Sequence, residues 1–230
     1  MHNFKKIFNK KKVIITGHTG FKGSWLTFWL KQLNANICGI SKNIPTQPSL
    51  FKTLNLKNGI KDYKVDIKNL NKIKKIILSQ KPDYVFHLAA QSLVKKSFSD
   101  PIDTFNTNAI GTCNLLESVK YLKNKCTLII ITSDKSYKNL EISRGYKEID
   151  EIGGYDPYSA SKGCAELIIQ SYIKSFYKNK KNIRIAVTRA GNVIGGGDWS
   201  NDRVIPDCFK SWASHKKVKI RNPNSTRPWQ

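Results

Sequence analysis

The sequence predicts an α/β protein with a parallel sheet covered by helices on both faces. Short runs rich in Val, Ile and Leu alternate along the chain with longer segments whose apolar residues recur at helical spacing. The apolar runs are nearly continuous and do not alternate with polar residues, which is typical of parallel strands buried on both sides. Together these two observations predict a sheet built from repeated β–α units.

Each element follows from a local pattern. Residues 11–17 ("KKVIITG") read as a buried strand, and residues 22–33 carry apolar side chains at helical spacing. Pro82 ends the helix expected before it, because proline cannot continue a helix. The strands are expected at 11–17, 35–41, 63–67, 84–90, 126–133 and 183–191, and the helices at 22–33, 70–80, 102–122 and 157–177.

Length and composition limit the class of protein. A chain of 230 residues can form one sizeable core and part of a second domain. No run of about 18 apolar residues occurs, and the basic N-terminal segment lacks the apolar stretch of a signal peptide. The five cysteines are scattered without a CxxC pair. We therefore expect a cytoplasmic protein with no metal site, no disulfide framework and no membrane partner.

The formal net charge of +24 raises the alternative of a nucleic-acid or anionic-membrane partner. Lysines occur in nearly every expected surface segment, and no arginine-rich stripe with interleaved aromatic residues stands out. This diffuse distribution favours a lysine-rich composition with solvated side chains. We expect no nucleic-acid partner.

The first strand leads into a glycine-rich turn, "TGHTGFKG", with Gly17, Gly20 and Gly23 in GxxGxxG spacing. Glycines allow the chain to turn sharply off the strand, to approach a pyrophosphate and to pack the helix closely on the strand. The helix start then offers free N–H groups to the phosphates. The turn predicts a Rossmann-type dinucleotide-binding domain. His18 and Lys22 could contact phosphate, but we expect both to be simply exposed in the loop.

The end of the second strand lacks the acidic residue that usually binds the ribose of NAD. Ser41 and Lys42 stand there instead, and a lysine could favour the extra phosphate of NADP or be merely solvated. Asp66 and Ile67, after the third strand, are candidates to flank the adenine; a plain surface aspartate is the alternative. These positions leave the choice between NAD and NADP open.

Tyr158 and Lys162 lie four residues apart in "YSASK", so a helix places both side chains on one face. A cationic lysine beside a tyrosine is expected to lower the phenol pKa, which allows a tyrosinate to act as a base. Thr132 and Ser133, at the end of the fifth strand, could supply the hydroxyl that completes a hydride-transfer site.

The motifs "TGHTGFKG", "HLAAQ", "YSASK" and "RAGNVIGGGDW" together resemble the extended short-chain dehydrogenase/reductase family. Within that family, "PSLF", "TSDKSY" and "RPWQ" are most similar to the 4,6-dehydratases that act on CDP-glucose. The resemblance implies NAD rather than NADP, a sugar-nucleotide substrate (CDP-glucose), and a homodimer formed through helices beside the sheet. The cofactor-binding residues that it implies are Gly17, Gly20, Phe21, Lys22, Gly23, Ser41, Asp66, Ile67, Leu88, Ala89, Ala90, Asn108, Tyr158 and Lys162.

The resemblance also implies roles for the strand end "TSDKSYKN". Such enzymes oxidise the sugar transiently at C4, eliminate water across C5 and C6, and return hydride to C6. Ser133 is then expected to bind the 4-oxygen beside Tyr158, and Asp134 to protonate the departing 6-hydroxyl. Lys135 becomes the candidate base at C5, which requires a neutral amine, or a group that stabilises the enolate.

Residues 1–190 are expected to form the cofactor domain, and residues 191–230 the incomplete start of a smaller substrate-binding lobe. The chain is shorter than enzymes of this type, which we interpret as C-terminal truncation. By resemblance, Asn192, Arg203 and Arg227 are candidate contacts to the nucleotide or diphosphate, because arginine binds phosphate bidentately. Surface ion pairs are the alternative for the two arginines.

Three other interpretations remain open at this point. An epimerase or dehydratase acting on UDP- or dTDP-sugars would share the fold, although an epimerase has no use for an acid–base pair at Asp134 and Lys135. The alternative from another class is a non-enzymatic, basic protein that only binds a nucleotide. The stretch "TSDKSYKN" could also be an exposed turn with a solvated Asp–Lys pair.

Overall fold

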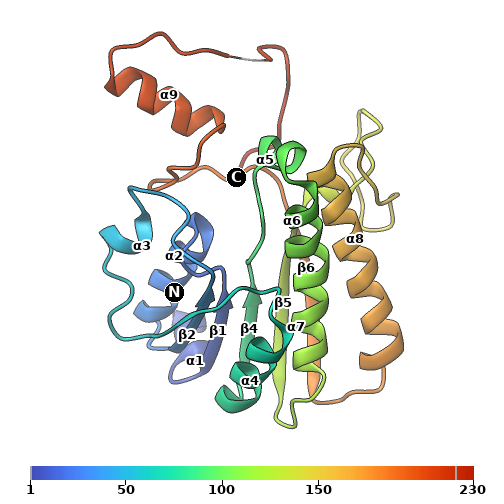
Figure 1. Ribbon diagram of the computed structural model, residues 1–230. Helices are drawn as coiled ribbons and strands as arrows, with labels where there is room; N and C mark the ends of the chain where they lie inside the picture. Colours follow the sequence, from blue (N-terminus) through green and yellow to red (C-terminus); the bar gives the residue numbers. More distant parts are fainter. Residues whose placement is uncertain (1, 221) are drawn as a thin grey trace.

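The computed structural model describes residues 2–220 and 222–230, and its centre is a six-stranded parallel sheet (Figure 1). The strand order is β3-β2-β1-β4-β5-β6. From β1 the chain adds β2 and β3 on one side and then β4, β5 and β6 on the other, so the order of strands reverses between β1 and β4. This is the doubly wound order of the Rossmann fold, so the predicted fold class is confirmed. The strands are β1 (Lys12–Thr16), β2 (Asn36–Ser41), β3 (Lys61–Lys64), β4 (Tyr84–His87), β5 (Cys126–Ser133) and β6 (Ile183–Ala190).

One face of the sheet carries the larger core, which lies beneath a layer of helices (Figure 1). Strand residues such as Ile14, Val85 and Leu128 are fully buried there against Leu115 and Ile169 of the helices. The apolar spacing along each helix turns one side toward the sheet. The helices of this layer are α4 (Leu70–Gln80), α6 (Pro101–Phe105), α7 (Gly111–Val119) and α8 (Pro157–Tyr172).

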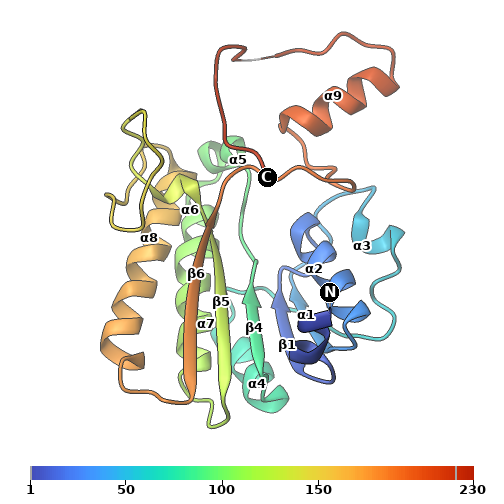
Figure 2. The same ribbon diagram turned by 180° about the vertical axis from the view of Figure 1, so that it is seen from behind.

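The opposite face is covered only in part (Figure 2). The helices α1 (His2–Phe8) and α2 (Phe21–Gln32) bury a second core over β1 and β2, with Phe8 and Leu30 among its members. Within the described residues no helix covers β5 and β6 on this side, where Ala186 and Thr188 are exposed. Coverage of both faces is therefore confirmed only for the first half of the sheet, and α1 was not predicted.

Several boundaries differ from the predictions. The third strand, expected at 63–67, is Lys61–Lys64, and Asp66 and Ile67 lie after it as expected. The expected helix 102–122 is divided by the π-helical turn η1 (Asn106–Ile110) between α6 and α7, and α8 continues into a second π turn, η3 (Ile173–Tyr177). Two short helices, α3 (Leu50–Thr53) and α5 (Val94–Ser99), were not predicted.

The segment after β6 lies beyond the carboxyl ends of the strands, where it includes α9 (Val204–Ala213) (Figure 1). Contacts to the rest of the chain include the Trp25 indole, which donates to the Gly196 carbonyl at 2.9 Å, the Arg203 guanidinium, which donates to the Ser92 hydroxyl at 3.2 Å, and the Lys95–Asp202 ion pair at 3.2 Å. Within the segment, the backbone of Asn192 pairs with Pro228 and Gln230. In the part of the chain described, no helix is both long and apolar enough to cross a membrane.

Candidate active site

The glycine-rich turn after β1 is packed too tightly to accept side chains. Gly17 has a φ of 75°, and a Cβ there would lie 2.7 Å from the Ala89 nitrogen and 2.8 Å from the Leu88 carbonyl carbon. A Cβ on Gly23 would lie 2.1 Å from the Gly17 oxygen. Gly20 begins α2 without a side-chain cap, which leaves helix N–H groups for an anion. This cradle fits the pyrophosphate of a dinucleotide.

The expectation that His18 is exposed is wrong. Its side chain is completely buried, with Nδ1 2.9 Å from the Ser41 hydroxyl and Nε2 3.0 Å from an Asp62 carboxylate oxygen. Gly39 makes room for the ring, since a Cβ there would lie 2.3 Å from it. Burial lowers the pKa of His18, and Asp62 opposes this effect. A neutral ring then donates from Nε2 to Asp62 and accepts at Nδ1 from Ser41.

The residues expected near the ribose and adenine lie at the ends of β2 and β3. Ser41 is buried at the end of β2, where an acidic residue is usual. Lys42 lies 3.3 Å from the Asp66 carboxylate, so its charge faces an opposite charge. Asp66 also accepts from the Lys68 backbone N–H at 3.0 Å, and Ile67 is buried. Asp66 is thus a bonded, half-buried group and not an isolated surface aspartate.

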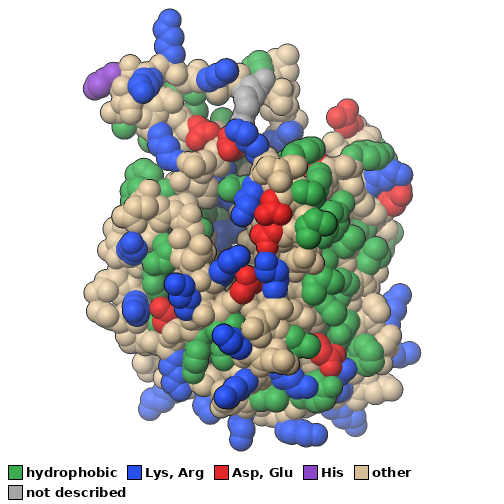
Figure 3. All heavy atoms as spheres, in the orientation of Figure 1, with side chains coloured by type: hydrophobic (Ala, Val, Ile, Leu, Met, Phe, Trp, Pro, Cys, Tyr) green, Lys and Arg blue, Asp and Glu red, His purple; other side chains and the backbone are tan. Residues whose placement is uncertain are grey.

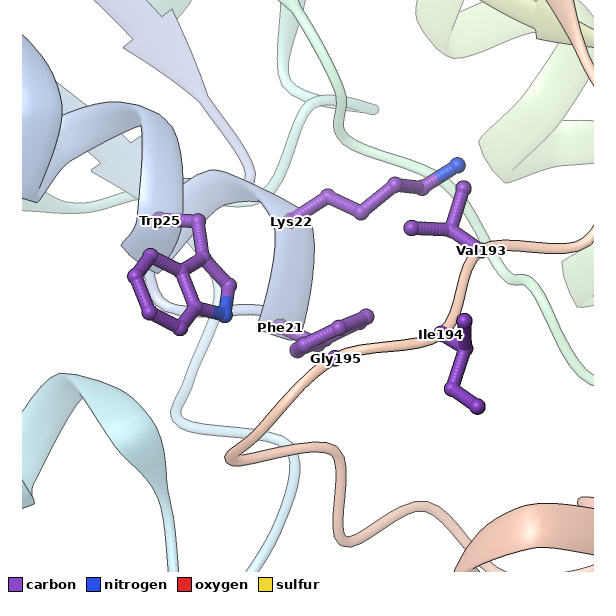
Figure 4. Close-up of a pocket in the computed structure, with 6 residues that line it drawn as sticks. All are labelled: Phe21, Lys22, Trp25, Val193, Ile194 and Gly195. Atoms are coloured by element: carbon purple, nitrogen blue, oxygen red, sulfur yellow. The ribbon is translucent and has the colours of Figure 1, made fainter. Parts of the chain in front are cut away.

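A pocket of about 360 Å³ lies between the start of α2 and the segment after β6 (Figure 4). Its walls are mostly apolar, and Lys22 extends across it toward Val193. Desolvation lowers the pKa of Lys22, and Arg203 adds to the effect, while Asp134 and Asp198 oppose it. The pocket therefore lies between the glycine-rich turn and the segment after β6. The lining residues are Phe21, Lys22, Trp25, Val193, Ile194 and Gly195.

Tyr158 and Lys162 are both buried on the face of α8 that meets the sheet. Burial lowers the pKa of Lys162 to about 8, and the nearby charge of Lys22 contributes. Burial raises the pKa of Tyr158, while hydrogen bonding with Ser133 acts in the other direction. The expected lowering of the Tyr158 pKa by Lys162 is therefore absent from this structure, because desolvation of the phenol outweighs the other effects.

The stretch "TSDKSYKN" leaves β5 through a short 3₁₀ turn, η2 (Asp134–Ser136). Ser133 caps this turn: its hydroxyl accepts from the Lys135 N–H at 3.2 Å and donates to an Asp134 carboxylate oxygen at 3.0 Å. Asp134 and Lys135 are half-buried, so the alternative of a fully exposed turn is wrong. The turn η2 packs against α8. The charge of Asp134 raises the pKa of both Lys22 and Tyr158, against the effect of burial for Lys22 and along with it for Tyr158.

Asn108 connects this helix to the loop after β4. Its side chain donates to the Gln91 carbonyl at 3.0 Å and to the Ser161 hydroxyl at 2.8 Å, and accepts from the Gln91 N–H at 2.9 Å. Ser161 in turn donates to the Tyr158 carbonyl at 2.7 Å. The π turn that contains Asn108 therefore positions the start of α8. Sequence reasoning missed Ser161 and Gln91, although both stand inside the motifs "YSASK" and "HLAAQ".

His87 is a second buried histidine that sequence reasoning did not single out. Its Nδ1 lies 2.7 Å from the Thr16 hydroxyl and its Nε2 3.0 Å from that of Thr112. Burial lowers the pKa of His87 to about 3, with the Lys162 charge contributing, so the ring is neutral near pH 7. The two bonds of His87 therefore join β1, β4 and α7 beneath the candidate site. Thr112 also donates to the Asn108 carbonyl at 2.7 Å.

The three residues predicted to contact substrate differ from one another in their positions relative to the site. Arg203 lies near Lys22, and its guanidinium donates to Asp198 at 2.9 Å and to Ser92 at 3.2 Å. Asn192 is half-buried in the segment after β6. Arg227 is exposed and donates to the Thr226 carbonyl, so the structure does not bring it to the site. Asp198 was missed, although "GGGDW" places a carboxylate five residues before Arg203.

The strand order, the glycine-rich turn after β1 and the buried Tyr–Lys pair on α8 define a doubly wound α/β protein of the Rossmann type. The model of one family, described as GDP-mannose 4,6 dehydratase, matches residues 14–230, and the chain belongs to this family.

A relative from Salmonella typhimurium, CDP-glucose 4,6-dehydratase, is 47% identical over 230 residues. The match covers 98% of this chain and 64% of the relative, so the chain spans less than two thirds of that protein's length. The similarity to the dehydratases that was drawn from the motifs is thereby confirmed.

Two solved structures share the fold. The UDP-glucuronic acid 4-epimerase of Bacillus cereus, in complex with UDP-glucuronic acid and NAD, has a TM-score of 0.80 at 26% identity, covering 95% of this chain and 68% of that one. A dTDP-glucose 4,6-dehydratase of Streptomyces venezuelae with NAD bound has a TM-score of 0.80 at 18% identity, covering 95% and 67%; this likeness concerns the fold alone.

Proposed function

We propose that this chain belongs to an NAD-dependent CDP-glucose 4,6-dehydratase. Residues 1–190 would form its cofactor domain and residues 191–230 the beginning of its substrate-binding lobe. The observation that carries the proposal is the placement of Tyr158 and Lys162, buried on one face of α8, against the turn that carries Asp134 at the end of β5. The relative from Salmonella typhimurium, 47% identical, supports the same activity.

The residues of the glycine-rich turn fit NAD. Gly17, Gly20 and Gly23 would hold the pyrophosphate, with the Leu88–Ala90 segment and Asn108 beside the site. Ser41 would contact the ribose, and the pairing of Lys42 with Asp66 favours NAD, because a lysine facing a carboxylate is a poor ligand for the extra phosphate of NADP. When bound, NAD supplies an acceptor for hydride from C4 of the sugar and returns it to C6.

Tyr158 would remove the proton from the 4-hydroxyl of the sugar as hydride leaves C4. With a pKa of about 8, Lys162 is still mainly charged near pH 7, so its ammonium can stabilise the tyrosinate in a dry site. Ser133, which already interacts with Tyr158, would donate a hydrogen bond to the 4-oxygen.

Asp134 and Lys135 would carry out the elimination of water. The 4-ketone acidifies the hydrogen at C5, a base removes it, and Asp134 protonates the departing 6-hydroxyl. Lys135 would serve as that base in its neutral form, or as a charged group that stabilises the enolate. Their half-buried position at the end of β5, with Asp134 acting on Tyr158, supports a role in the same reaction.

The test is turnover of three candidate substrates. The protein is incubated with NAD and with CDP-glucose, dTDP-glucose or UDP-glucose in separate reactions, and the products are examined by mass spectrometry. We expect a product lighter by one water molecule, formed fastest from CDP-glucose. Preference for another nucleotide would overturn the choice of base, and a product of unchanged mass would favour an epimerase.

A homodimer formed through the helices α6 and α8 is part of the proposal. Figure 3 shows apolar side chains gathered in a band over this side of the molecule, and Ile102 and Leu167 are 73% and 59% exposed. Exposed apolar bands are typical of protein–protein interfaces, which supports the proposed dimer. Leu167→Asp should shift the protein toward the monomer in light scattering, whereas Leu140→Asp, in an exposed loop, should not. An unchanged mass for Leu167→Asp would contradict this interface.

A further inference from the structure

A buried ion pair lies directly behind the candidate site. The Glu166 side chain is 3% exposed and the Arg189 side chain 13%. The guanidinium donates through Nε at 2.9 Å and through Nη2 at 3.1 Å, one bond to each carboxylate oxygen, in a bidentate arrangement. Glu166 follows Lys162 by four residues and Tyr158 by eight, so all three side chains lie on the same side of α8.

The pair holds the residue that precedes the strand-end turn. Thr132 and Arg189 are register partners on β5 and β6, and both bond to Glu166. The Thr132 hydroxyl donates to the carboxylate at 2.5 Å, and Thr132 is followed at once by Ser133, Asp134 and Lys135. The strand end is thereby tied to the catalytic helix one helical turn beyond Lys162.

The same pair also holds the residue that follows the turn. The Arg189 guanidinium lies over the Tyr137 ring, 4.6 Å from its centre, in a cation–π contact. Tyr137 comes directly after the 3₁₀ turn, and Arg189 also donates to the Glu148 carbonyl at 3.3 Å. The turn with Asp134 and Lys135 is therefore held on both flanks by one guanidinium–carboxylate unit.

Stability alone does not explain this arrangement. Apolar residues of similar volume often replace a buried ion pair without loss of stability, because removing two charges from water is costly. The planar fork of arginine does, however, fix distances and directions among its partners in a way that apolar contacts do not. The partners here belong to the two elements that the proposed reaction must keep in register.

We propose that Glu166 and Arg189 are positioning residues that hold the Ser133–Asp134–Lys135 turn in register with Tyr158 and Lys162. In the proposed reaction the first hydride transfer uses Tyr158 and Lys162 and only the Ser133 hydroxyl from the turn, whereas the elimination depends on Asp134 and Lys135. Loss of the pair should therefore slow the elimination more than the first step. This catalytic part rests on the proposed function, and the geometric part does not.

The geometric part is tested on the chain itself by amide hydrogen exchange. Arg189→Lys keeps the charge but loses the planar fork, and Arg184→Lys is the matched control, since Arg184 is exposed on the same strand. We expect Arg189→Lys to speed exchange at residues 133–137 at least fivefold while β1 and β2 stay unchanged, and Arg184→Lys to change neither. Unchanged exchange at 133–137, or an equal rise throughout the sheet, would overturn the inference.

The catalytic part is tested by separating the two half-reactions. We expect Arg189→Lys to lower the rate of product formation at least tenfold while the appearance of reduced nicotinamide absorbance changes less than threefold. Glu166→Gln should behave in the same way. An equal loss of both rates would show a merely structural role and overturn the inference. Absence of turnover by the unaltered full-length protein would instead defeat the proposed function, and hydrogen exchange would still decide the geometric part.

Discussion

The helix α8 and the segment after β6 both contribute residues to the candidate site, yet they are held in different ways. Tyr158 and Lys162 on α8 are buried, and hydrogen bonds from Asn108 through Ser161 hold the start of this helix. The segment after β6 exposes the aromatic residues of α9, and its Arg203 bonds to Asp198 of the same segment and to Ser92 in the loop after β4. The packed interior thus holds the residues of α8, whereas the segment after β6 depends on fewer contacts, most of them at exposed positions.

The largest loss of activity is expected for a substitution on the buried helix α8, at Tyr158. Tyr158→Phe removes the proposed base but preserves the buried ring, so the fold should persist while turnover falls by about 10²- to 10⁴-fold. Tyr155→Phe is the matched control, because Tyr155 is 87% exposed and lies three residues earlier. The measurement is the rate of product formation by both variants. Near-normal turnover by Tyr158→Phe would remove α8 from the catalytic site.

The second prediction concerns the cost of burying Lys162. Its pKa falls from 10.5 to about 8 in the folded protein, so the unfolded chain binds more protons between these pH values and stability rises with pH across that window. Below pH 8 the shift corresponds to a cost of about 3 kcal/mol. Lys162→Met should therefore raise the free energy of unfolding at pH 7 and remove this part of the pH dependence.

Denaturant unfolding at pH 7 and pH 9.5 measures this effect. Lys174→Met, at an exposed position after α8, should change neither the stability nor its pH dependence. A Lys162→Met protein that is less stable at pH 7 than the unaltered chain would show that the ammonium is well compensated by its surroundings.

The smallest effects are expected in the segment after β6. Arg203→Gln should raise the KM for the sugar nucleotide about tenfold, since a charge-assisted hydrogen bond contributes about 1.5–3 kcal/mol. Arg227→Gln should change KM less than about twofold, because Arg227 is exposed and bonds only to the neighbouring Thr226 carbonyl among the contacts described. The reverse ranking would place Arg227 in the nucleotide site and make Arg203 a partner of Asp198 only.

The elements that the sequence predicted well are those whose pattern is local and strongly apolar. The fifth strand was predicted with its observed bounds, Cys126–Ser133, because its interior is a continuous Leu–Ile run. The third strand was misplaced, since Lys61–Lys64 is a short and largely exposed strand at the sheet edge without an apolar pattern. The helix α1 was missed because its seven residues are too few to show a clear period.

In the candidate site, as in the fold, the sequence predicted the features that depend on one element and missed those that depend on several. The glycine spacing and the Tyr158–Lys162 pair can be read directly, because each depends on neighbours along one element. The burial of His18 cannot, since it requires the absent side chain of Gly39 and the carboxylate of Asp62 on two other strands. The Glu166–Arg189 pair likewise forms only when α8 packs against β6. Contacts between distant segments are what a single sequence does not display.

The path of the hydrogen at C4 tests the proposed function most directly. The protein is incubated with NAD and CDP-glucose that carries deuterium at C4, and the product is analysed by mass spectrometry and NMR. We expect a 4-keto-6-deoxy sugar with one deuterium in the methyl group at C6, because the hydride leaves C4 and returns to C6 of the same sugar. A dehydrated product without deuterium at C6, or deuterium retained at C4, would contradict the proposed internal hydride transfer.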